Sequence, residues 1–176
     1  IELKDMVDSA KPKLAYWKIR GLIVTAKYAM EYLGAEYEEV HYTVDKQEDG
    51  SYTTDTWLAI KPTLGLDFPN LPYVVDGTNH FTESTAIWRW VCNKYGPHLL
   101  GNDVAEKSQG DQMLSVISGI KGQVTVPSYN PASIKADLGK IAVEKIALVA
   151  KYIGTKDHIV GKAITIADFL AFETID

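Results

Sequence analysis

The residues best placed for ligand binding in this chain lie where a helical stretch begins. Glu83 and Ser84 precede the apolar pattern of that helix, and the first backbone N–H groups of a helix have no partner within it. With the serine hydroxyl, these N–H groups form a site that suits an anion. A plain helix cap uses the same groups, so the two interpretations are compatible. The pattern predicts an anion-binding site.

Thiol and metal chemistry have little support in the sequence. Cys92 is the only cysteine among the 176 residues, so there is no CxxC pair and no zinc cluster. We interpret Cys92 as a small buried hydrophobe and not as a nucleophile. The four histidines show no ligand spacing. We expect no metal, no redox cofactor, and a reducing, cytoplasmic setting.

Composition narrows the possible partners. The formal net charge is −5 and the pI about 5.4, which disfavours nucleic acid and anionic membranes, because both attract clustered Lys and Arg. Hydrophobic residues make up 46% of the chain, as expected for a globular protein with a core. No apolar run approaches the ~18 residues of a membrane span. The mixed, charged segment 1–11 does not resemble a signal peptide.

The elements that must position these residues follow a recognisable order. Apolar runs, alternation and helical spacing predict a strand, a helix and a strand, then two strands joined by the turn Asp76-Gly77, and a helix. This βαβ-ββα order is that of a thioredoxin-like domain. The expected strands are 14–17, 37–43, 73–75 and 80–82, the expected helices are 22–33, 57–60 and 83–95, and 45–56 is expected to be a loop.

The rest of the chain is predicted to be helical, so the fold class is α/β followed by all-α. An i, i+3/i+4 rhythm covers 134–153, and Thr165 with Asp168 forms a capping-box-like pair before another helix. We assign that pair no catalytic role. The chain stops at Asp176 in mid-helix, so we expect the helical domain to be incomplete there. The expected boundaries are an N-terminal extension at 1–11, the thioredoxin-like domain at 12–95, a linker at 96–103 and the helical domain at 104–176.

Five separated stretches resemble the mu class of glutathione transferases. They occur in the family's order and at nearly its spacing, from about residue 13 to the end of the chain. The resemblance implies an enzyme that joins the thiolate of reduced glutathione to hydrophobic electrophiles, and a homodimer. The stretches are YWKIRGL at 16–22, LGLDFPNLPY at 64–73, ESTAI at 83–87, YNP at 129–131, and Gly161 with Thr165 and Asp168.

The chemistry that such an enzyme needs is modest. A free cysteine thiol titrates near pH ~8.5, so neutral glutathione is mostly the poorly nucleophilic thiol. Lowering that pKa by two units takes roughly 2.7 kcal/mol of thiolate stabilisation. One charge-assisted hydrogen bond contributes roughly 1.5–3 kcal/mol. By resemblance, the Tyr16 hydroxyl supplies that bond; the alternative is a strand tyrosine that packs at a domain edge.

The resemblance also implies which residues hold glutathione. The motif Asn70-Leu71-Pro72 resembles the family's cis-proline turn, whose Leu71 backbone pairs with the cysteinyl part of the tripeptide. Glu83 and Ser84 take the γ-glutamyl end; mu-class proteins usually have glutamine at the first position, whereas other classes have Glu-Ser. The implied contacts are Trp17, Leu22, Trp57, Lys61, Asn70, Leu71, Pro72, Glu83 and Ser84, with Trp57 and Lys61 at the glycyl carboxylate.

Two further aromatic residues have implied roles outside the glutathione site. Tyr129 matches a tyrosine that faces the electrophile, although an aromatic residue in a helical domain also suits a core. Phe68, between Asp67 and Pro69, matches the residue that inserts between helices of the partner subunit. An exposed phenylalanine at this position also suits a dimer better than a monomer.

The chain departs from the family pattern at two positions. Thr54 stands where an arginine near the glycyl end is common, and Gly119 stands about where an aspartate reaches the ligand's amine across the dimer. These departures support an alternative, a subunit with this fold that serves structure or assembly with little activity. Intact Tyr16, Trp57, Lys61 and Ser84 oppose it. A thioredoxin-type oxidoreductase is excluded because no cysteine ends the first strand.

Overall fold

Strand β1 lies inside the sheet of the first structural unit and is buried on both faces. The structure, a computed structural model, describes residues 11–49, 52–128 and 135–176, and the chain divides into two units, Ile1–Tyr95 and Gly96–Asp176. In the first unit the strand order is β2-β1-β5-β6. Strand β1 pairs in parallel with β2 and antiparallel with β5. The strands are β1 (Lys13–Trp17), β2 (Glu38–Tyr42), β5 (Tyr73–Asp76) and β6 (Asn79–Thr82).

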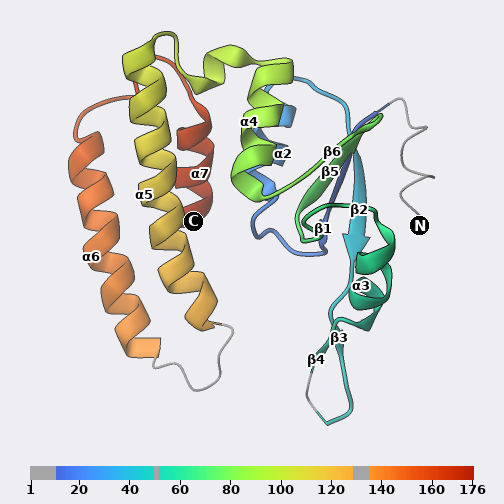
Figure 1. The fold of residues 1–176 in the computed structure, drawn as a ribbon. Helices are drawn as coiled ribbons and strands as arrows, with labels where there is room; N and C mark the ends of the chain where they lie inside the picture. Colours follow the sequence, from blue (N-terminus) through green and yellow to red (C-terminus); the bar gives the residue numbers. More distant parts are fainter. Residues whose placement is uncertain (1–10, 50–51, 129–134) are drawn as a thin grey trace. The chain divides into compact units, whose positions relative to one another are not determined.

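Helices cover both faces of this sheet. Helices α2 (Val24–Tyr32) and α4 (Ser84–Tyr95) pack together on one face, and the short helix α3 (Asp55–Ile60) lies over the other (Figure 1). Side chains alternate along a strand, so Leu14 and Tyr16 of β1 point to one face and Ala15 to the other, and all three are buried. The βαβ-ββα order in the sequence predicts this thioredoxin-like arrangement, and the structure confirms it.

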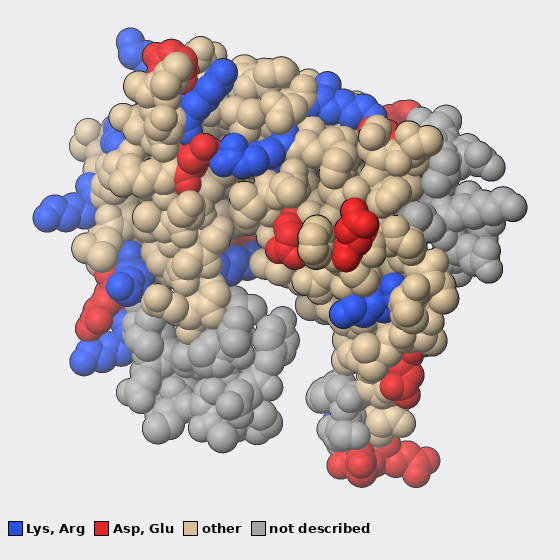
Figure 2. Space-filling model, viewed as in Figure 1, with Lys and Arg blue, Asp and Glu red and all other residues tan. Residues whose placement is uncertain are grey.

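The segment expected to be a loop between β2 and α3 contains a small hairpin. Strands β3 (Asp45–Lys46) and β4 (Tyr52–Thr53) pair antiparallel, so the loop prediction for 45–56 was wrong in part. The segment has no apolar alternation to announce a strand. The one-turn helix η1 (Lys61–Thr63) follows α3. Acidic side chains gather at the exposed end of the hairpin (Figure 2).

The second unit is helical. A 3-10 turn η2 (Pro97–Leu100) precedes three helices, and α5 packs against both of the others. The Asp168 carboxylate accepts hydrogen bonds from the Thr165 N–H (2.8 Å), the Thr165 hydroxyl (2.8 Å) and the Ile159 N–H (2.9 Å), so the predicted pairing of Thr165 and Asp168 is confirmed. The helices are α5 (Val104–Ser128), α6 (Lys135–Ile153) and α7 (Ile166–Ile175).

None of the helices in the described part of the chain is long and apolar enough to span a lipid bilayer.

Two buried threonines offer a matched test of polar satisfaction. Thr25 in α2 is fully buried and its hydroxyl has no hydrogen-bond partner among the described residues, whereas the hydroxyl of buried Thr165 donates to Asp168. A buried hydroxyl without a partner costs about 1–3 kcal/mol, and valine has nearly the same shape. We expect Thr25→Val to raise the free energy of unfolding by about 1 kcal/mol and Thr165→Val to lower it by about as much, measured by urea denaturation. A loss of stability in Thr25→Val would show that the Thr25 hydroxyl is not an unsatisfied group.

Candidate functional site

The strand register gathers the predicted residues at one end of the first sheet. The observed pairs are Ala15 with Tyr73 and Tyr73 with Thr82. Tyr16 follows Ala15 on β1, and the cis Leu71-Pro72 bond comes directly before Tyr73. Glu83 and Ser84 follow Thr82 at the end of β6. Residues far apart in the sequence therefore meet at the carboxyl ends of β1 and β6.

Tyr16 lies directly over the turn that leads into α2. Tyr16 is 8% exposed, and Gly21 in that turn has a backbone φ of +50°. A Cβ atom on Gly21 would lie 2.4 Å from Tyr16 Cε1 and 2.8 Å from the Tyr16 hydroxyl oxygen. Contacts that short do not occur, so only glycine leaves the tyrosine hydroxyl in this position. The sequence motif includes Gly21 but does not reveal this role; its only signal is a glycine five residues after the tyrosine.

The peptide bond between Leu71 and Pro72 is cis, as the resemblance predicts. Leu71 is buried, and its N–H donates to the side-chain oxygen Oδ1 of Asn70 at 3.0 Å. Asn70 itself is exposed. A ligand that pairs with the Leu71 N–H must therefore take the place of the Asn70 amide, an exchange that the sequence did not reveal.

The start of α4 presents donors toward solvent. The Ile87 N–H is bonded to the Glu83 carbonyl oxygen (3.0 Å), which leaves the three preceding N–H groups without partners inside the helix. Among the described residues, no group bonds to the Ser84 hydroxyl. Glu83 is exposed and has φ of +69°, a conformation that non-glycine residues seldom adopt. The arrangement suits a ligand that carries both a carboxylate and an amine.

Trp57 and Lys61 supply a second set of donors. Trp57 is the only buried residue in α3 and is 5% exposed, yet its indole N–H has no acceptor within the part of the chain that the structure describes. Lys61 begins η1, four positions further on, and likewise has no ion-pair partner there. One charged and one neutral donor, both without acceptors among those residues, can hold a second carboxylate.

The remaining predicted residues fall at the margins of this group. Trp17 is half-buried and its ring meets the edge of Trp57 at 6.4 Å between centroids. Leu22 is 39% exposed beside the turn that contains Gly21. Tyr129 lies outside the described residues, so its place is not assigned. Gly119 is in α5, with open space where a side chain would begin, and Thr54 is the residue before α3.

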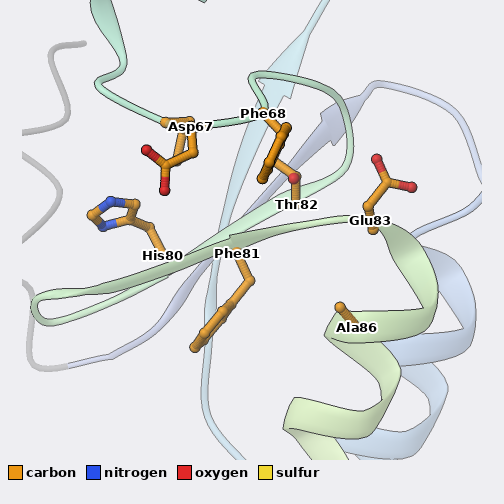
Figure 3. A pocket seen from close by; sticks show the side chains of 8 residues that line it. Asp67, Phe68, His80, Phe81, Thr82, Glu83 and Ala86 are labelled. Atoms are coloured by element: carbon orange, nitrogen blue, oxygen red, sulfur yellow. The ribbon is translucent and has the colours of Figure 1, made fainter.

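Phe68 lines a cavity of about 290 Å³ that Glu83 also lines. Its ring is 77% exposed. Figure 3 shows Asp67 and His80 at one end of this cavity and Glu83 at the other, with the Phe68 ring beside Thr82 between them. An exposed aromatic ring next to a hollow is typical of a contact surface.

Cys92 takes no part in this group. It is buried in α4, and burial raises the pKa of its thiol to about 12. A thiol with such a pKa is not a nucleophile at neutral pH.

Known proteins resemble the chain over most of its length. A family model described as the glutathione S-transferase N-terminal domain matches residues 12–93. Glutathione S-transferase Mu 1 of Oryctolagus cuniculus is 36% identical over 165 residues, which cover 93% of this chain and 74% of the relative. Glutathione S-transferase Mu 4 of Mus musculus is also 36% identical, with the same coverage. Among solved structures, that of the glutathione S-transferase Blo t 8 matches with a TM-score of 0.80, at 29% identity, over 93% of this chain and 75% of that one.

Proposed function

Because the chain belongs to the glutathione S-transferase family, we propose that it conjugates reduced glutathione to hydrophobic electrophiles, with the tripeptide bound at the end of the first sheet. One observation supports this proposal: strand pairing brings the backbone at Tyr16, the cis Leu71-Pro72 bond and the start of α4 to the same end of the first sheet. A hydroxyl donor, an extended backbone and a helix start then face one small ligand.

The two ends of glutathione match the two groups of donors. The γ-glutamyl carboxylate suits the N–H groups and hydroxyl at Ser84, and its amine suits the Glu83 carboxylate. The glycyl carboxylate suits the Trp57 indole N–H and the Lys61 ammonium. Between them, the cysteinyl backbone pairs with Leu71 in place of the Asn70 amide. Trp17 and Leu22 line the tripeptide.

The reaction needs only a thiolate held at the right place. The Tyr16 hydroxyl donates to the glutathione sulfur and stabilises its negative charge. The sulfur then forms a bond to the electrophilic carbon, and the leaving group departs with the bonding electrons. Glutathione is a co-substrate here, and the proposal includes no metal or redox cofactor. We further propose a cytoplasmic location, which the single, buried cysteine supports.

The first test removes the Tyr16 hydroxyl. We expect Tyr16→Phe to lower kcat/KM for conjugation of chlorodinitrobenzene by about 10- to 100-fold at neutral pH, since a hydrogen bond to a charged group contributes roughly 1.5–3 kcal/mol. The deficit should shrink toward pH 9, where glutathione ionises unaided. Tyr37→Phe is the matched control, because the Tyr37 hydroxyl bonds to exposed Glu31 (2.9 Å) away from the sheet end. If the unmutated protein is folded but has no activity, the structural-subunit alternative is favoured.

The second test concerns the proposed homodimer, in which Phe68 inserts into the partner. We expect Phe68→Ser to shift the protein toward monomer in sedimentation analysis, because the change removes an apolar side chain that is 77% exposed in the single chain. Val104→Ser is the control, since Val104 is 81% exposed at the start of α5. A Phe68→Ser protein that remains as dimeric as the control would contradict this contact.

A further inference from the structure

Two buried tyrosines, one on β2 and one on β5, meet across strand β1 of the first sheet. Tyr42 on β2 is paired with Trp17, and Tyr73 on β5 is paired with Ala15. Because Ala15 and Trp17 are two residues apart on β1, all four side chains lie on the same face. The small Ala15 side chain leaves room above the strand, and the two tyrosine hydroxyls meet there at 2.7 Å.

The two hydroxyl groups satisfy each other. Tyr73 is fully buried and Tyr42 is 6% exposed, and a buried hydroxyl without a partner is costly. Burial also raises the pKa of both phenols, so the pair stays neutral at ordinary pH. The hydrogen bond ties the ring on β2 to the ring on β5 and fixes their relative tilt.

Trp57 rests on these two rings. Its indole lies nearly parallel to the Tyr73 ring, with an interplanar angle of 23° and 6.3 Å between centroids. It meets the Tyr42 ring at 5.2 Å and 66°. Trp57 is also the only buried side chain of α3, so these ring contacts, together with its contact to Trp17, help to hold the helix on the sheet. Within the described residues, no hydrogen bond of its own fixes the indole.

We infer that Tyr42 and Tyr73 are positioning residues for Trp57, and that their mutual hydrogen bond sets the direction of the indole N–H at the glycyl end of glutathione. This inference rests on the proposed function, in which that N–H binds the glycyl carboxylate. The hydroxyl pair does not touch the ligand. Loss of this hydrogen bond should weaken binding only at the glycyl end of the tripeptide. A general loss of protein stability would weaken binding at both ends.

The test compares two ligands that differ only at that end. Calorimetric titration of the full chain measures Kd for glutathione and for γ-glutamylcysteine, which lacks the glycyl residue. We expect Tyr73→Phe to raise Kd for glutathione roughly three- to tenfold and to leave Kd for γ-glutamylcysteine within about twofold. Tyr42→Phe should behave alike and serves if Tyr73→Phe does not fold. Tyr37→Phe, which removes a surface hydroxyl, should change neither value.

A second arm asks whether the tyrosines act through the tryptophan. In a Trp57→Phe background, which lacks the indole N–H, adding Tyr73→Phe should have no further effect on Kd for glutathione. An equal loss of affinity for both ligands, unchanged affinity for glutathione, or a full additional loss in the Trp57→Phe background would each overturn the inference. Failure of the unmutated protein to bind glutathione would overturn the proposed function itself, and the inference with it.

Discussion

The close approach of Gly21 to the Tyr16 ring is the constraint on which the rest of the site depends. The turn into α2 passes so near that a single added carbon would lie 2.8 Å from the hydroxyl oxygen. Glycine, with φ of +50°, allows the chain to turn into the helix here and leaves space for the phenol. The rest of the proposed chemistry, a stabilised thiolate and its attack on an electrophile, requires that phenol to stay in place.

The pairing of the strands positions the other parts of the site. Antiparallel pairing of β1 with β5 and of β5 with β6 brings the turn before β5 and the start of α4 to the level of Tyr16. On the opposite face, α3 is held by one buried tryptophan on a pair of hydrogen-bonded tyrosines. In the proposed function, one end of glutathione binds at the start of α4 and the other end binds at α3 and η1.

The sequence predicted those features whose signals lie within a few consecutive residues. The cis bond before Pro72 and the pairing of Thr165 with Asp168 both lie within short motifs, and the structure has both. The Tyr42–Tyr73 hydrogen bond joins residues 31 positions apart, and nothing in either neighbourhood announces it. The hairpin of β3 and β4 was missed because two-residue strands carry no periodicity. The engagement of the Leu71 N–H by Asn70 depends on a side-chain orientation that no sequence pattern encodes.

The central claim is that the Tyr16 hydroxyl stabilises the thiolate of bound glutathione. The most direct measurement is the titration of that thiol in the binary complex, followed by ultraviolet absorbance of the thiolate, in the unmutated protein and in Tyr16→Phe. We predict a bound thiol whose pKa is about two units below the ~8.5 of a free thiol in the unmutated protein, and close to ~8.5 in the variant. The same pKa in both proteins would contradict this role of Tyr16.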